Sequence, residues 1–170
     1  MLKEKIRQNL NIAIKEKREL EALVLRLINA AIFNKEKEKR YKISKEKPEF
    51  SGEELEKESQ LTDEETIDVI SSEIKKRRES IELFEKGKRM DLVEKETKEK
   101  EILEKYLPEQ LSEEEIKKLA KEAITKVEAK EMRDFGKVMA ELMPQIKGKA
   151  DGTLVSKIIK ELLIPKNDQS

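Results

Sequence analysis

Charged side chains interrupt two apolar helical stripes of this chain, and they are the first residues to consider for chemistry. One stripe has Arg77 near its centre and otherwise consists of Ile67, Ile70, Ile74, Ile81 and Phe84. A second stripe runs from Leu92 to Tyr106 and carries Glu96 and Glu99 in its middle. An antiparallel helical hairpin would bring the two stripes together, so we expect Arg77 to pair with Glu96 or Glu99. Arg26, earlier in the chain, is a further candidate partner.

Two roles are open to a glutamate in such a pair. It can act as a general acid or base. It can also be purely structural, because removing either partner would strand a charge. We interpret Arg77 and its glutamates as a structural ion pair that sets the register of two helices, and the acid–base role is the alternative.

A second candidate site is the segment from Asp134 to Lys160, in which glycines flank helix ends and lysines surround them. Residues 147–160 have a net charge of +3, since Asp151 alone opposes Lys147, Lys149, Lys157 and Lys160. Free backbone N–H groups at the start of the last helix would suit a phosphate oxygen. The same glycines would also serve a tight turn between two helices, and the spacing alone leaves both interpretations open.

Other chemistries are excluded by residues that the chain lacks. It has no cysteine, so no disulfide, thiolate nucleophile or sulfur-ligated metal is available. It has no histidine, which removes the usual general base and the commonest metal ligand. The segment from Gly148 to Gly152 lacks the spacing of a phosphate-binding loop. We therefore expect no catalytic residues, no metal and no cofactor.

The elements that position these residues are predicted to be helices. Charged residues make up 45% of the 170, against about 25% in an average protein, and only five Gly and four Pro interrupt them. Apolar spacing predicts seven helices, over residues 2–14, 18–39, 62–87, 91–107, 112–127, 134–143 and 151–164. Residues 41–61 lose this periodicity and are expected to form a charged loop, with at most a helical turn at residues 53–58. The expected boundary signals are capping boxes at Thr62–Glu65 and Ser112–Glu115, caps at Asp91 and Asp151, a left-handed stop at Gly87 and ends at Pro144 and Pro165.

The predicted class is therefore all-α, with a natural boundary in the segment from Leu107 to Ser112. We expect a long antiparallel helical N-terminal domain over residues 1–108. A small three-helix C-terminal domain follows over residues 109–165, and residues 166–170 are expected to fray.

Charge is neutral overall but unevenly distributed. Residues 1–45 carry a net charge of +7 and residues 46–73 a net charge of −9. These blocks can attract each other, or the basic block can face a polyanion. No window is apolar enough for a signal peptide or a membrane span, so we expect no membrane association and a cytoplasmic location, with an organelle matrix as the other possibility.

Several sequence blocks in a fixed order are familiar. They are residues 73–84 (EIKKRRESIELF), 87–92 (GKRMDL), 101–111 (EILEKYLPEQL), 134–139 (DFGKVM) and 148–152 (GKADG). In these blocks the chain resembles the GatB/YqeY family, and the resemblance covers nearly its whole length. The 41–61 segment is longer than is typical of that family.

The resemblance implies a stand-alone version of the helical and tail region of the B subunit of tRNA-dependent amidotransferase, without that enzyme's catalytic centre. Its tail module touches the tRNA body, so the implied partner is tRNA. We expect phosphate contacts from a set of lysines and close backbone approach at two glycines. These residues are Lys137, Lys147, Lys149 and Lys157, with Gly136 and Gly148.

Two alternatives stay open. The chain can be a helical adaptor that docks on amidotransferase subunits or a synthetase, which would require an exposed apolar patch on the first two helices. It can also be a weak amidase or amidotransferase, a carbon–nitrogen ligase with glutamine as amido donor, acting on aminoacyl-tRNA. That activity would require an acidic pocket around Glu96 or Glu99.

Overall fold

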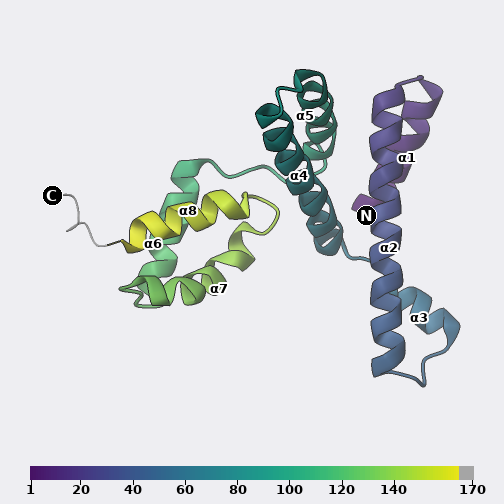
Figure 1. The fold of residues 1–170 in the computed structure, drawn as a ribbon. Helices are drawn as coiled ribbons and strands as arrows, with labels where there is room; N and C mark the ends of the chain where they lie inside the picture. Colours follow the sequence, from purple (N-terminus) through teal and green to yellow (C-terminus); the bar gives the residue numbers. More distant parts are fainter. Residues whose placement is uncertain (165–170) are drawn as a thin grey trace. The chain divides into compact units, whose positions relative to one another are not determined.

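The computed structural model describes residues 1–164, which form eight α-helices, one short 3-10 helix and no strand (Figure 1). The all-α class is therefore confirmed. The helices belong to two compact units, one of residues 1–107 and one that begins at Pro108. We call them unit 1 and unit 2.

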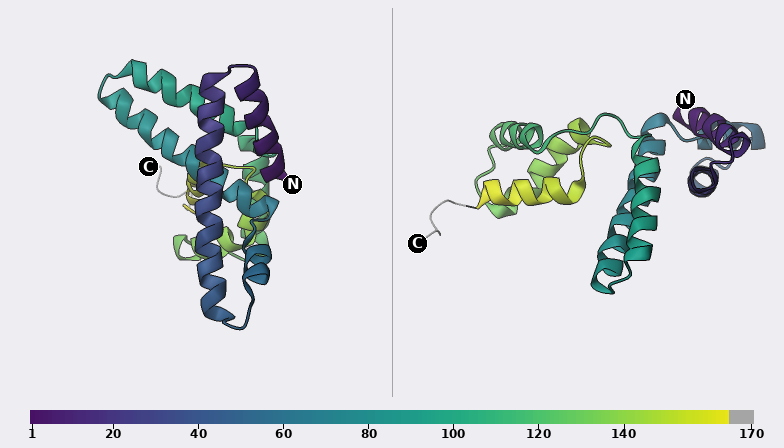
Figure 2. Two further views of the ribbon diagram at one scale, coloured as in Figure 1. Left: turned by 90° about the vertical axis from the view of Figure 1, so that its right-hand side faces the viewer. Right: turned by 90° about the horizontal axis from the view of Figure 1, so that it is seen from above.

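Unit 1 contains five helices. They are α1 (Leu2–Lys15), α2 (Glu19–Glu46), α3 (Gly52–Ser59), α4 (Asp63–Lys86) and α5 (Met90–Glu104). Helices α1 and α3 pack along α2, and α4 and α5 form an antiparallel hairpin (Figures 1 and 2). Their shared core is built from Ile6, Val24, Leu25, Ile28, Ile32, Leu61, Ile70, Ile74, Leu103 and Tyr106. The long helix α2 is thus the central element of the unit.

The charged loop expected at residues 41–61 is wrong for most of its length, whereas the helical turn expected at residues 53–58 is part of a helix. Helix α2 continues to Glu46, and α3 forms a further helix whose N-cap is Ser51. Lysine and glutamate are good helix formers, so the helix continues where apolar periodicity has ended. Pro48 then restricts the residue before it, which leaves a connection of only residues 47–51.

The α4–α5 turn also differs from expectation. Gly87 has a right-handed φ of −80°, and the left-handed residue is Lys88, with φ 56°. The Lys88 N–H donates to Glu85 O (3.0 Å) and the Arg89 N–H to Phe84 O (2.9 Å), which is a Schellman motif. The stop therefore lies one residue later than expected. Asp91 is not the cap of α5, because the helix has already begun at Met90.

The same motif ends two other helices. Lys17 after α1 and Glu128 near the end of α6 (Glu113–Lys126) have φ values of 56° and 53°. The N–H groups of Arg18 and Ala129 close these turns on the preceding helix. Three helices thus end in a left-handed conformation without a glycine at that position.

Unit 2 consists of α6, a 3-10 turn η1 (Met132–Asp134), α7 (Phe135–Ile146) and α8 (Gly152–Leu163). Each α-helix contacts the other two. Among the described residues of the unit, the core is entirely apolar and contains Ile116, Ala120, Ala123, Val138, Leu142, Ile146, Val155, Ile158, Ile159 and Leu163. Pro144 was expected to follow the end of α7, but it lies inside the helix. A proline removes its own N–H bond and its ring crowds the carbonyl four residues earlier, but burial of Ile146 keeps the last turn on the core.

Several expected boundaries are confirmed. Thr62 with Glu65 and Ser112 with Glu115 form capping boxes, and the Asp151 carboxylate caps α8. The stop expected at Pro165 and the fraying expected at residues 166–170 lie outside the described residues.

Candidate functional site

The hairpin of unit 1 buries an ion pair between α4 and α5. Arg77 Nη2 lies 3.1 Å from Glu99 Oε2, and Arg77 Nη1 lies 3.4 Å from Glu73 Oε2. The residues Arg77 and Glu99 are only 7% and 5% exposed. Antiparallel packing of the two stripes brings these side chains together, and Glu73 joins them from one turn earlier on α4.

Not every expected partner takes part in this cluster. Among the described residues, Glu99 and Glu73 contact Arg77, whereas Glu96 is half-buried nearby on α5 and Arg26 is exposed on α2. The i, i+4 spacing of Glu73 and Arg77 is the signal that would have found the missed partner. Because Glu99 is fixed by an arginine and shielded from solvent, the geometry favours the structural role over acid–base chemistry.

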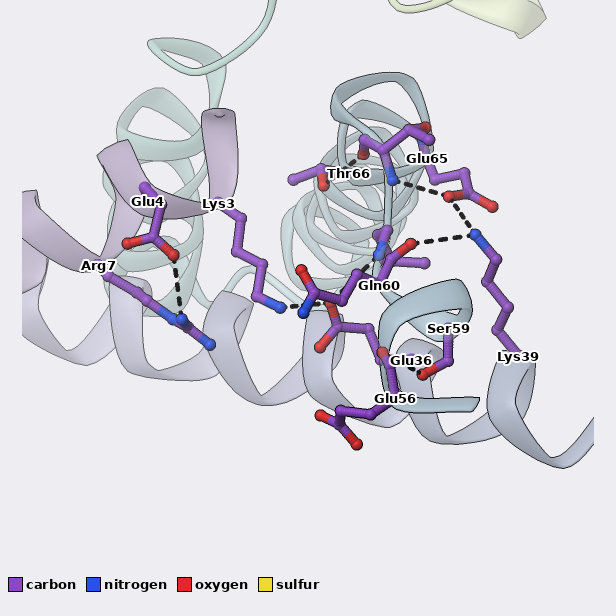
Figure 3. Close-up of polar contacts among 12 residues, drawn as sticks. Lys3, Glu4, Arg7, Glu36, Lys39, Glu56, Ser59, Gln60, Glu65 and Thr66 are labelled. Atoms are coloured by element: carbon purple, nitrogen blue, oxygen red, sulfur yellow. Dashed lines mark hydrogen bonds and ion pairs between the residues drawn. The ribbon is translucent and has the colours of Figure 1, made fainter. Parts of the chain in front are cut away.

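A second polar cluster in unit 1 joins helices that are distant in sequence (Figure 3). Lys3 of α1 pairs with Glu36 of α2, and the Leu61 N–H donates to the same carboxylate at 3.2 Å. Lys39 of α2 donates to the Gln60 carbonyl (3.1 Å) and the Glu65 carboxylate (2.8 Å). This cluster fastens α1 and the α3–α4 connection to α2. Sequence reasoning missed it, because nothing in local spacing links residues 3 and 36.

Opposing effects act on the Glu65 carboxyl. Partial burial raises its pKa, but hydrogen bonds from Lys39 and from the Thr62 N–H outweigh burial, so the pKa is lowered overall. Glu65 is therefore held as a carboxylate that caps α4 and pairs with Lys39, which is a structural arrangement.

In unit 2, the turn between α7 and α8 presents two exposed lysines on a fixed backbone. Gly148 in this turn has a left-handed φ of 72°. Gln110 Nε2 donates to the Gly148 carbonyl (2.8 Å), and the Leu111 N–H donates to the Lys149 carbonyl (2.7 Å). The Lys149 N–H in turn donates to Ile146 O (2.8 Å). Lys147 and Lys149 thus extend from a turn tied to the start of the unit; we call residues 147–149 the lysine turn.

The other expected tRNA-contacting residues lie elsewhere. Gly136 and Lys137 are in the first turn of α7, about 16 Å from its other end by helix rise, and Lys137 Nζ lies 3.1 Å from Asp134. Lys157, on α8, lies 3.9 Å from Glu161 and helps Lys117 to lower the pKa of Glu113. The expected residues therefore occupy separate places rather than one cluster.

The expectation of free N–H groups at the start of α8 is wrong. Asp151 Oδ1 accepts hydrogen bonds from the N–H groups of Thr153 (2.9 Å) and Leu154 (3.0 Å). A cap of this kind satisfies the donors and places a negative charge where a phosphate would have bound. These two N–H groups are therefore not free to bind a phosphate oxygen.

Two further features are absent from residues 1–164. No helix among them is both long and apolar enough to cross a membrane. No three acidic side chains within residues 1–164 gather in a way that could hold a metal ion.

Most of the chain matches one known protein family. The family model described as Yqey-like protein matches residues 34–163. The chain belongs to the YqeY-like family. The match includes the Arg77–Glu99 pair and the lysine turn, and it leaves out α1 and the first half of α2.

Two curated proteins match parts of this YqeY-like chain. Altered inheritance of mitochondria protein 41, mitochondrial, from Pyrenophora tritici-repentis is 40% identical over 105 residues, which are 60% of this chain and 58% of that protein. Uncharacterized protein C22F3.15 from Schizosaccharomyces pombe is 43% identical over 51 residues, 30% of this chain and 42% of that protein. The alignments thus span about half the length of these relatives.

Proposed function

We propose that this chain is a tRNA-binding accessory protein, related to the tail of tRNA-dependent amidotransferase and without a catalytic centre of its own. The observation that carries the proposal is the lysine turn. Its two exposed lysine side chains extend from a backbone that is held in place by hydrogen bonds from Gln110 and Leu111. Cations on a pre-ordered turn lose little backbone entropy when they meet a phosphate.

The proposed contacts are to phosphates and not to bases. A-form RNA hides its base edges in a deep, narrow major groove, so a helical protein meets its backbone first. Lys147 and Lys149 would contact neighbouring phosphates, and Gly136 with Lys137, about 16 Å away by helix rise, would meet a separate part of the backbone. Binding should therefore depend steeply on salt.

The test is binding of bulk tRNA to the full chain at low and at physiological salt. The charge-reversal variant Lys147→Glu/Lys149→Glu should bind at least about tenfold more weakly and show a salt slope lower by about 2. The matched control is Lys118→Glu/Lys121→Glu, which changes two exposed lysines of α6 by the same charge. An equal loss of tRNA affinity in both variants would mean that binding depends only on general electrostatics. Unchanged affinity in the Lys147→Glu/Lys149→Glu variant would show that the lysine turn is not the binding site.

The cytoplasm is the proposed location, since tRNA is used there. The name of the Pyrenophora relative includes the word mitochondrial, which makes the mitochondrial matrix the alternative. Expression of a tagged full-length protein followed by organelle fractionation separates the two.

A second candidate function, docking on another protein, is favoured by a specific observation. Helix α2 exposes Leu23, Leu27 and Phe33 to solvent. This is the kind of patch that an adaptor for amidotransferase subunits or a synthetase requires. The third alternative, an amidase, is not proposed, because Glu99 is engaged by Arg77.

A further inference from the structure

Helix α2 has an apolar ridge on the side that faces away from the core. The ridge consists of Leu23 (41% exposed), Leu27 (47%), Ala30 and Phe33 (55%). The opposite side of the same helix supplies Val24, Leu25, Ile28 and Ile32 to the core. The spacing of four, three and three residues makes the ridge one continuous strip, which we call the α2 ridge.

The α2 ridge lies between two depressions of the surface. One, of about 530 Å³, opens between α1 and α2 beside Leu10, Ala30 and Phe33. The other, of about 810 Å³, opens between α2 and α4 beside Leu27, Ala30 and Val69. A second helix can pack against a ridge that is flanked by hollows, because side chains of that helix enter the hollow on each side of the ridge.

Charge around the α2 ridge is positive on the α1 side. Arg7 and Arg26 line the smaller hollow with Asn11 and Asn29, and none of the described residues that line it carries a carboxylate. On the α4 side the charges balance, because four lysines and four carboxylates line the larger hollow. The Nζ–Oε distances there are 3.0 Å for Lys35–Glu38, 2.8 Å for Lys39–Glu65 and 2.6 Å for Lys76–Glu73. Arg7 Nη1 also lies 3.1 Å from Glu4, an exposed residue of the same helix, whereas no carboxylate among residues 1–164 lines the hollow beside Arg26. The positive charge beside the ridge therefore comes from Arg26 and from an Arg7 whose present partner is exposed to solvent.

This distribution of charge distinguishes between three kinds of partner that could cover the α2 ridge. A second copy meeting the ridge through a two-fold axis would bring Arg26 toward its own equivalent, which is unfavourable. RNA would satisfy the arginines but not the aliphatic side chains of Leu23 and Leu27. An amphipathic helix with carboxylates beside its apolar stripe satisfies both.

We propose that the α2 ridge binds an amphipathic helix of another protein, with Arg26, and Arg7 in exchange for its exposed partner Glu4, pairing to Asp or Glu side chains that flank the apolar stripe of that helix. The proposal rests on the second candidate function and names the chemistry of its partner. The ridge residues precede residue 34, where the family match begins, so the proposal concerns a part of the chain that the family model does not cover.

The test uses two peptides about three heptads long, with Leu at both apolar positions and either Glu or Lys at the flanking positions. Binding to the full chain is measured by titration calorimetry. The Glu peptide should bind at least about tenfold more tightly than the Lys peptide. The variant Leu27→Glu should lose this binding, whereas Leu83→Glu, which alters another exposed leucine on α4, should keep it.

Charge reversal provides the decisive readout. In Arg7→Glu/Arg26→Glu the preference should invert, so that the Lys peptide becomes the tighter ligand. Arg133→Glu, an exposed arginine in unit 2, is the control and should leave the preference unchanged. Circular dichroism establishes that each variant retains its helices.

Three outcomes would overturn the proposal. The first is equal or absent binding of the two peptides. The second is a dimer that Leu27→Glu converts to a monomer, which would assign the ridge to a second copy. The third is competition by tRNA that depends on Arg26, which would assign it to RNA. Loss of tRNA binding in the lysine-turn variant concerns unit 2 alone, so failure of the two proposals is distinguishable.

Discussion

Unit 1 buries charged side chains among its apolar ones, whereas the described residues from Pro108 onward bury apolar side chains only. The buried charges are Lys3, Arg77 and Glu99. Long helices can slide by a turn and still match apolar stripes, and a buried ion pair penalises such a slip. In unit 2, α6 and α8 have side-chain caps, and the three short helices share a compact apolar core instead. The comparison indicates that unit 1 gains a defined register from interactions that contribute little net stability.

The largest effect is expected from breaking the buried pair. Arg77→Leu should destabilise unit 1 by about 3–5 kcal/mol, because it leaves Glu99 charged and buried without its partner. The double variant Arg77→Leu/Glu99→Leu should recover most of this loss. Urea unfolding followed by circular dichroism measures both. A double variant no more stable than the single one would show that the pair stabilises the hairpin directly.

A loss of stability of comparable size, which no second substitution should recover, is expected in unit 2. Leu142 is fully buried, and Leu142→Ala should cost about 3 kcal/mol through lost burial and a cavity. Hydrogen exchange should report faster opening of α6, α7 and α8. Met143→Ala, at a 40% exposed neighbour, is the control and should cost much less. Equal exchange in both variants would contradict the apolar-core description.

A gain of about 1 kcal/mol is expected at a left-handed helix end in each unit. Lys88→Gly in unit 1 and Glu128→Gly in unit 2 remove the steric cost of a positive φ. Thermal unfolding should shift upward for both variants. Lys86→Gly, at the last residue of α4, is the control and should give no gain, because Lys86 does not have a positive φ. A gain in only one unit would mean that the two turns differ in strain.

The smallest effect concerns alkaline pH and belongs to unit 1, since both tyrosines of the chain lie there. Burial raises the pKa of Tyr106, although the hydrogen bond with Asn9 partly opposes this. A raised folded-state pKa gives stability that is present below about pH 10 and lost as pH rises further. Tyr106→Phe should remove this part of the alkaline loss. Stability curves that stay parallel for native and variant proteins would exclude the effect.

Local signals in the sequence predicted part of this structure. The capping boxes at Thr62 and Ser112 follow from a spacing of three residues. The stripe spacing also pointed to Arg77 and Glu99, whose side chains lie 3.1 Å apart. Both depend on helix periodicity, which a single sequence displays.

Other features depend on tertiary packing and could not be predicted locally. Glu36 meets Lys3 across 33 residues, and Gln110 meets Gly148 across 38. The extension of α2 to Glu46 depends on helix propensity and not on an apolar face. In a hydropathy pattern, such a segment looks like a polar loop. The length of α7 likewise decides which of the expected lysines lie close together.

The hydrogen bonds of the lysine turn have a mechanical consequence. The Leu111 N–H holds the Lys149 carbonyl, and Gln110 holds the Gly148 carbonyl. Both donors precede α6, so these two bonds close a ring of chain within unit 2 that contains α6 and α7. A force applied to the chain before residue 110 would therefore be carried by the lysine turn before it reaches α6.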